Sequence, residues 1–224
     1  EALLGSYVDY DGSVLVIDPS GRGQDETAYA VVKMLNGYLY VAACGGIKGG
    51  YSEQTLTKLA HLAKDHKVNM LLIESNFGDG MFTELIKPIL KKIYPVTTEE
   101  VRHSKQKELR IIDTLEPVMN QHKLIIDPKV IQDDFDSVQH HPTEKAQKYM
   151  LTYQLTRVTK ERGSLAHDDR LDALAMGVAY WVEQMAADVD MEMRGRKEQA
   201  LMDELDKFVN GYNINSQPRA NTWI

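Results

Sequence analysis

Three aspartates lie within the eight residues Ala166 to Ala173, "AHDDRLDA", directly before the apolar run "LAMGVAYWV". Asp169 and Asp172 are three residues apart, so a helix beginning here would carry both on one side. Carboxylates this close repel each other and destabilise the fold unless a positive charge lies among them. The pattern therefore raises the question of which cation they bind.

Two further acids stand at the ends of apolar segments elsewhere in the chain. The segment "SVLVIDP" predicts a buried strand that ends at Asp18, and "VNMLLIES" predicts a second that ends at Glu74. Neighbouring strands would bring these two carboxylates to one edge of a sheet, within reach of the helix-start aspartates. Hard Mg²⁺ or Mn²⁺ takes oxygen ligands, and a pair of such ions hydrolyses phosphodiesters by activating water and stabilising the leaving oxygen.

We therefore predict a two-ion site. Its catalytic and metal-binding residues are Asp18, Glu74, Asp169 and Asp172, with Asp168 and Asp25 as additional candidate ligands and His167 as a candidate for orienting water or phosphate. Other interpretations exist for each residue, because an Asp before Pro forms turns and Asp168 or Asp169 could cap the helix. Asp172 fits a capping role least, and the residues taken together favour the metal site.

Basic residues gather in the middle of a chain whose formal net charge is -7. That net charge argues against a surface that binds nucleic acid everywhere and confines any polyanion contact to a local patch. The candidate DNA-binding residues are Lys48, Arg102, Lys105, Lys107 and Arg110. Lys48 lies in the glycine-flanked "GGIKGGY", which we interpret as a loop, and the others lie at an expected strand-to-helix junction. Solvated helix faces are the alternative explanation for Lys87, Lys91 and Lys92.

The order of elements predicts an α/β domain with a mixed sheet. Asn36-Gly37 is a strong hairpin signal between segments 27–35 and 37–46, so the first three strands are expected to be antiparallel. Further strands are expected at 68–75, 96–103 and 124–128. Helices are expected at 52–67, 78–93, from a cap at Ser104, in pieces over 129–149, and from 168 to 185. Residues 150–165 fit a strand or a helix.

Residues 1–186 are expected to form one domain, and the charged tail 187–224 is expected to bind a partner or to be partly disordered. The single cysteine, Cys44, excludes an internal disulfide and favours a reducing compartment. We expect no membrane partner and, since no G-x-x-x-x-G-K-[ST] motif occurs, no ATPase in this chain. The chain opens without methionine, so we expect it to be part of a longer protein.

Four segments, "VLVIDPSGRGQDET", "LLIESNFGDG", "HSKQKELRI" and "HDDRLDALA", resemble in order and spacing a known family. It is the carboxyl-terminal nuclease domain of the large terminase subunit of tailed bacteriophages, of the podophage type, and the resemblance covers about residues 13–184. It implies an RNase H-like fold and an Mg²⁺- or Mn²⁺-dependent endonuclease that cuts concatemeric double-stranded DNA during packaging in the host cytoplasm. It also implies an amino-terminal ATPase domain outside this chain, and the portal and the small terminase subunit as partners.

By motif position, the resemblance makes Asp18 the ligand that bridges both ions and Glu74 the second carboxylate. The third is a helix-start aspartate, with Asp169 ahead of Asp172 and Asp168, and Asp25 matches an auxiliary ligand. Lys48 falls in a DNA-gating element, and we expect the loop 43–51 to limit access to the site. Two alternatives stay open: another RNase H-like nuclease, such as a junction resolvase or transposase core, and a catalytically silent scaffold.

Overall fold

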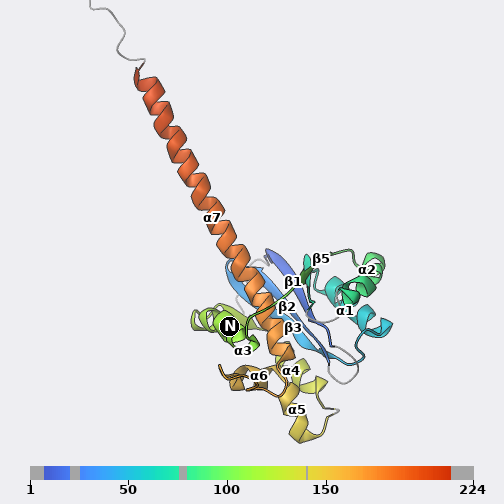
Figure 1. The fold of residues 1–224 in the computed structure, drawn as a ribbon. Coiled ribbons are helices and arrows are strands. Elements are labelled where there is room, and N and C mark those ends of the chain that lie inside the picture. The colour runs from blue at the N-terminus through green and yellow to red at the C-terminus, as the bar shows by residue number, and fades with distance from the viewer. Residues whose placement is uncertain (1–7, 21–25, 76–79, 140, 213–224) are drawn as a thin grey trace, which may run out of the picture. The chain divides into compact units, whose positions relative to one another are not determined.

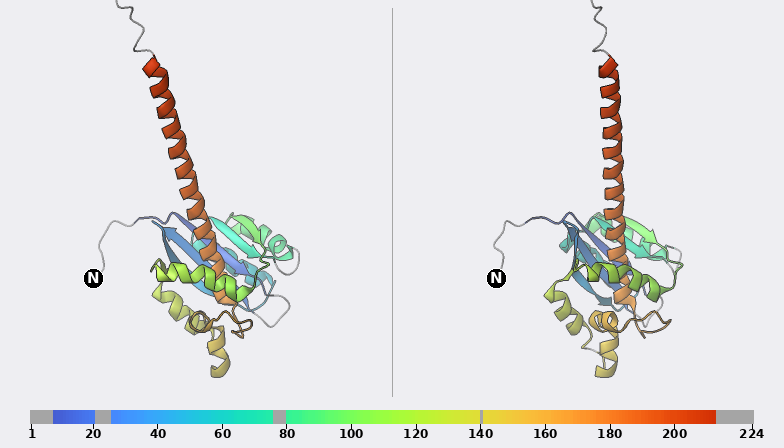
Figure 2. Two further views of the ribbon diagram at one scale, coloured as in Figure 1. Left: turned by 60° about the vertical axis from the view of Figure 1, so that its left-hand side comes forward. Right: turned by 90° about the vertical axis from the view of Figure 1, so that its left-hand side faces the viewer.

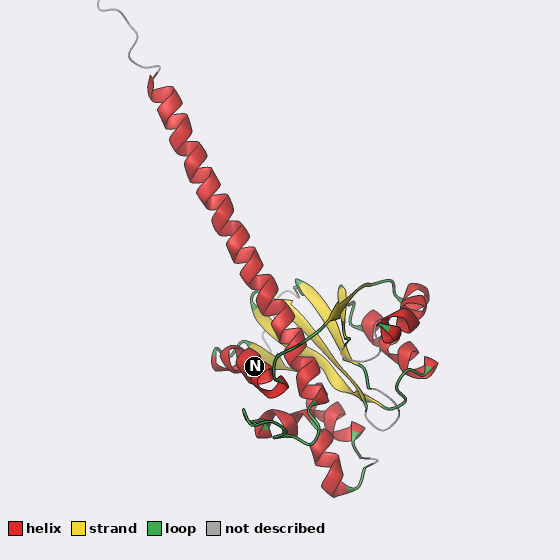
Figure 3. Cartoon of the chain, in the orientation of Figure 1, coloured by secondary structure: helices red, strands yellow, loops and turns green. Residues whose placement is uncertain are grey.

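A computed structural model describes residues 8–20, 26–75, 80–139 and 141–212. Its centre is a six-stranded sheet in the order β5-β4-β1-β2-β3-β6 (Figures 1 and 3). The strands are β1 (Gly12–Asp18), β2 (Thr27–Leu35), β3 (Tyr38–Ile47), β4 (Met70–Glu74), β5 (Thr97–Val101) and β6 (Leu124–Ile126). β1, β2 and β3 pair antiparallel, whereas β4, β5 and β6 each join in parallel. The predicted fold class is confirmed.

The hairpin between β2 and β3 follows from its two turn residues. Asn36 and Gly37 both have positive φ, 52° and 76°. A two-residue turn of this kind matches the twist of the flanking strands, and Asn-Gly adopts it at low cost. The turn therefore fixes the register that places β3 against β2.

Helices cover both faces of the sheet. Leu15 and Ile17 of β1 face the core formed with α1 (Glu53–Asp65) and α2 (Met81–Ile93). Val16, on the other face, packs beneath α7 (Asp169–Tyr212), where an added Cβ on Gly177 would lie 3.3 Å from its Cγ2. The absence of a side chain at Gly177 thus lets the helix approach the sheet. Figure 2 shows α3 (Lys107–Asn120) on this same face, beside the beginning of α7.

Three short helices complete the first part of the chain: α4 (Pro128–Ser137), α5 (Thr143–Tyr149) and α6 (Leu151–Arg157). The ambiguous segment after Met150 is thus helical at its start. The expected cap at Ser104 is wrong, because α3 begins at Lys107 after Gln106, whose side chain donates instead to the Lys160 carbonyl oxygen, 3.2 Å away.

The expected loop 43–51 and the expected end of the last helix also differ from the structure. Residues 43–47 belong to β3 and pair with β2. α7 continues to Tyr212 rather than ending near Met185, because residues 186–212 contain no proline and include the i,i+4 pair Glu192 and Arg196.

The chain divides into two compact units, Glu1–Trp181 and Val182–Ile224. The first unit contains the sheet and its core. In the second, the side chains of the described helix are almost all exposed. Across the described ranges, no helix combines the length and apolarity that crossing a membrane requires.

Candidate metal centre

Strand geometry brings Asp18 and Glu74 together. β1 and β4 run parallel with Ile17 opposite Ile73, so the next residues, Asp18 and Glu74, end the two strands side by side. Alternation along β1 puts Asp18 on the same face as Val16, beneath α7. The side chains of Asp18 and Glu74 are 16% and 6% exposed. Two carboxylates are therefore held close together in a largely dehydrated place.

Asp172 supplies a third carboxylate from the first turn of α7. Its side chain is fully buried. One carboxylate oxygen each from Asp18, Glu74 and Asp172 lie within 4.8 Å of one another. Three oxygen ligands at this separation suit a hard divalent cation such as Mg²⁺ or Mn²⁺.

Asp168 and Asp169 lie at the same place and, with Asp18, Glu74 and Asp172, form what we call the acidic cluster. Five of the six acids named from the sequence are thus brought together, whereas Asp25 lies outside the described residues. His167, a candidate for orienting water or phosphate, stacks on Tyr149 with ring centroids 3.9 Å apart.

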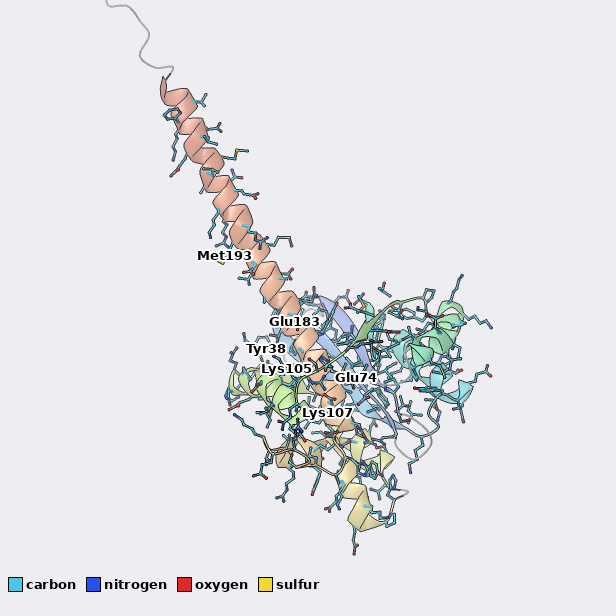
Figure 4. The ribbon with its side chains drawn as sticks, in the orientation of Figure 1. Tyr38, Glu74, Lys105, Lys107, Glu183 and Met193 are labelled. Carbon is cyan, nitrogen blue, oxygen red and sulfur yellow. The ribbon has the colours of Figure 1, made fainter. Side chains whose placement is uncertain are left out.

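Lys107, which Figure 4 labels together with Glu74, inserts its ammonium into the acidic cluster. Its Nζ lies 2.9 Å from Asp168 Oδ1, 3.2 Å from Asp172 Oδ2 and 3.4 Å from Asp169 Oδ1. A fourth carboxylate oxygen, from Asp18, is 3.7 Å away. A single amino group therefore faces four of the five acids.

Arg110, one turn further along α3, binds the buried part of the cluster. Its Nη2 donates to both oxygens of Asp172, at 2.7 and 2.8 Å, and its Nη1 is 3.8 Å from Glu74 Oε1. The sequence predicted Arg110 and Lys107 as DNA contacts; the structure places both among the carboxylates. They answer the question of what offsets the repulsion among these acids in the absence of metal.

The two cations do not balance the five acids. Burial, and then the charge of Glu74, raise the pKa of Asp18 to about 9. Burial also raises the pKa of Asp172 to about 6, although Lys107 and Arg110 oppose the shift. Burial alone would lower the pKa of Lys107, but the surrounding carboxylates outweigh it and raise that pKa. The acidic cluster therefore favours the uptake of further positive charge.

The remaining predicted DNA contacts are exposed. Lys48 follows the end of β3, and Lys105 lies between β5 and α3. Arg102 directly follows β5, and its Nε donates to Ser75 Oγ at 3.1 Å. Ser75 is the residue after Glu74 in the chain. Arg102 thus contacts the residue that follows Glu74, Lys105 lies two residues before Lys107, and Lys48 lies on a separate turn.

Sequence reasoning missed Arg170, which lies between Asp169 and Asp172 in the motif. Its side chain is 1% exposed and forms ion pairs with Glu26 and Asp134. The sequence did contain one indication of this role. Arg170 is the only basic residue among the aspartates at the start of the helix, and on a helix it must point away from Asp172.

Comparisons with known proteins agree with this geometry. Residues 17–124 match the family described as terminase bacteriophage T7, ribonuclease H-like domain. The large terminase subunit of Enterobacteria phage T3 is 48% identical over 179 residues, which are 80% of this chain and 30% of that protein. The chain thus spans about a third of the length of this relative.

Solved structures show the same fold at low identity. The human cytomegalovirus terminase nuclease domain, Mn-soaked and inhibitor-bound, matches with a TM-score of 0.54 at 16% identity, covering 80% of this chain and 87% of that one. A K428A mutant of the nuclease domain of the large terminase subunit gp2 of bacterial virus Sf6, with manganese, matches with a TM-score of 0.51 at 12% identity, covering 77% and 90%. Residues 17–124 of this chain therefore match the ribonuclease H-like domain of phage large terminase subunits in sequence, and the chain shares the fold of terminase nuclease domains.

Proposed function

We propose that this chain is a metal-dependent DNA endonuclease that cuts concatemeric double-stranded viral DNA during packaging. The observation that carries the proposal is the convergence of Asp18, Glu74 and Asp172 from two strand ends and a helix start. The T3 relative is named as a large terminase subunit, and the titles of the Sf6 and cytomegalovirus structures include manganese. The manganese in those titles agrees with divalent-metal chemistry at this site.

One carboxylate oxygen each of Asp18, Glu74 and Asp172 lie within 4.8 Å of one another, so these residues would hold the ions, with Asp169 as a further ligand. By its place in the motif, Asp18 is proposed as the ligand that two ions would share. A pair of Mg²⁺ or Mn²⁺ ions, when bound, supplies an activated water and stabilises the leaving oxygen. The buried surroundings of Glu74 and Asp172 limit competition from bulk water. Asp168 is placed to pair with Lys107, and Asp25 remains a candidate ligand.

DNA contacts are assigned to Lys48, Arg102, Lys105, Lys107 and Arg110. Lys105 and Arg102 are exposed on segments that adjoin the site, where they can pair with backbone phosphates. Nothing in these contacts selects a base, so we expect little sequence preference. Lys107 and Arg110 would reach the phosphate nearest the reacting bond, because they already lie at the carboxylates.

The wider role is also a proposal. Since the chain spans 30% of its T3 relative, we infer that it acts with an amino-terminal ATPase domain of the same protein, and with the portal and small terminase subunit, in the cytoplasm of the infected bacterium. The tail 187–224 is proposed to bind a partner, and the exposed part of α7 from residue 187 onward is the segment of it that would do so.

Cleavage of supercoiled plasmid at low salt tests the nuclease proposal. Wild type, Asp18→Asn and Asp169→Asn are compared with Mg²⁺, Mn²⁺, Ca²⁺ or EDTA, and Asp113→Asn, an exposed aspartate on α3, serves as the matched control. We expect nicking and linearisation with Mg²⁺ or Mn²⁺ by wild type and by the control, and loss of cleavage in both site variants.

Two other outcomes would count against the proposal. Cleavage that persists in EDTA, or in folded Asp18→Asn, would exclude the carboxylate site as its origin. A wild-type protein that neither cuts DNA nor gains thermal stability from Mn²⁺ would favour a catalytically silent scaffold.

A further inference from the structure

The side of α7 that faces away from the acidic cluster has its own set of charged residues. Arg170 donates from Nε and Nη2 to the two oxygens of Glu26, at 2.6 and 2.8 Å. Its Nη1 donates to Asp134 Oδ1 at 2.8 Å and to Ser137 Oγ at 2.9 Å. We call Arg170, Glu26, Asp134 and Ser137 the Arg170 cluster. It ties the first turn of α7 to the residue before β2 and to α4.

A second tie reaches the same turn through α6. Asp134 also accepts the backbone N–H of Leu151, at 2.9 Å, at the start of α6. Gln154, on the same short helix, accepts the N–H of Leu171 through its Oε1, at 3.0 Å. Asp134 and Gln154 are both 1% exposed. The hydrogen bonds therefore close a ring that runs from α7 through α4 and α6 and back to α7.

Helix geometry gives this ring a consequence for the metal ligands. Residues advance by about 100° each around a helix, so Arg170 projects roughly 160° away from Asp172. Fixing Arg170 on one side of α7 therefore fixes the rotation of the helix that presents Asp169 and Asp172 on the other. A small rotation of this turn would carry both carboxylates away from Asp18 and Glu74.

We infer that Arg170 is a positioning residue for the metal site: held by Glu26 and Asp134, it sets the rotation of the first turn of α7 that presents Asp169 and Asp172. The inference rests on the proposed function. Burying an arginine and two carboxylates is costly unless their polar atoms are paired, as they are here, and a core of apolar side chains would stabilise a helix at least as well. The ring supplies what apolar packing lacks, a directional constraint on the turn.

The close approach of β3 supports this reading. Gly46 lies so near Glu26 that an added Cβ would stand 1.9 Å from the Glu26 carboxyl carbon. The strand therefore leaves room for this carboxylate only because residue 46 has no side chain. The position of the Glu26 carboxylate is thus constrained from both β3 and Arg170.

The test is calorimetric titration of the 224-residue chain with Mn²⁺ at a temperature well below the melting point of every variant. Arg170→Lys keeps the charge and removes the planar fork that engages Glu26. We expect it to weaken Mn²⁺ binding about 10- to 100-fold, the range typical of residues that orient metal ligands. Leu59→Ala, a buried truncation on the opposite face of the sheet, is the matched control for loss of stability alone.

The outcomes separate the two proposals. Wild-type Mn²⁺ affinity in Arg170→Lys, or an equal loss in Leu59→Ala, would overturn the positioning role and leave the nuclease proposal standing. A wild-type chain that binds no Mn²⁺ would overturn both. If Arg170→Lys does not fold, Glu26→Gln decides, because it keeps the shape and weakens only the ion pair; weaker Mn²⁺ binding supports the inference and unchanged binding refutes it.

Discussion

The acidic cluster and the Arg170 cluster occupy opposite sides of one helical turn, yet their charges are arranged differently. In the acidic cluster, five carboxylates face Lys107 and Arg110. In the Arg170 cluster, two carboxylates share one guanidinium, and backbone N–H groups complete the bonding of Asp134. The first leaves a surplus of negative charge and favours a further cation, whereas the second is satisfied within the fold.

The largest expected effect comes from breaking the satisfied cluster. Arg170→Met would leave Glu26 and Asp134 buried without their cation, so we expect the free energy of unfolding to fall by about 3–5 kcal/mol. Urea denaturation measures this loss. Adding Glu26→Gln and Asp134→Asn to Arg170→Met should restore part of it, because the unpaired charges are then absent. A single-variant loss below about 1 kcal/mol would show that the cluster is not structural.

For Asp18→Asn in EDTA, we expect the free energy of unfolding to rise instead of fall. At neutral pH the folded state must keep Asp18 protonated, at a free-energy cost that asparagine does not incur, so the variant should stabilise the metal-free protein by roughly 2 kcal/mol. Urea denaturation in EDTA measures the gain, and Asp113→Asn, exposed on α3, should give none. A loss of stability in Asp18→Asn would contradict the surplus of negative charge.

The pH dependence of stability sharpens this prediction. The pKa of Asp18 is raised to about 9 by burial and by Glu74, so the folded state holds a proton that the unfolded state has lost. The contribution to stability is complete below the unfolded pKa of about 4 and is lost as pH rises through the folded pKa. In EDTA, wild type should lose stability from about pH 4 to pH 9, and Asp18→Asn should show a shallower decline.

Substitutions of Lys107 test whether a divalent metal displaces the lysine ammonium from the acidic cluster. Because its ammonium contacts four carboxylates, it competes with a divalent ion for their oxygens. Lys107→Ala should therefore bind Mn²⁺ about tenfold more tightly in calorimetry, a gain of ~1.4 kcal/mol. Lys107→Arg retains the charge and should stay near wild type. Weaker binding by Lys107→Ala would show that the lysine supports the site instead.

The features of the fold and the site that could be predicted are those that depend on residues near one another in the sequence. The sheet and the ends of β1 and β4 follow from apolar runs and the Asn36-Gly37 turn, so Asp18 and Glu74 could be placed beforehand. The insertion of Lys107 among the acids depends on a contact across 62 residues, which leaves no mark on the local pattern. The length of α7 was missed because a loss of apolar residues was taken as its end, although exposed helix formers continue it.

The smallest effect is expected at Lys105, two residues before Lys107 but exposed to solvent. If Lys105 pairs with a DNA phosphate, Lys105→Ala should reduce the slope of log affinity against log salt concentration by about one. Fluorescence anisotropy with a labelled duplex in Ca²⁺, at several salt concentrations, measures that slope. The charge of Lys107 is already offset by the carboxylates, so Lys107→Ala should change the slope less than Lys105→Ala does, even where Lys107 reaches a phosphate from within the acidic cluster. Equal changes at the two lysines would mean that Lys107 leaves the acidic cluster when DNA binds, so that the contrast between the two sides of α7 holds only for the free protein.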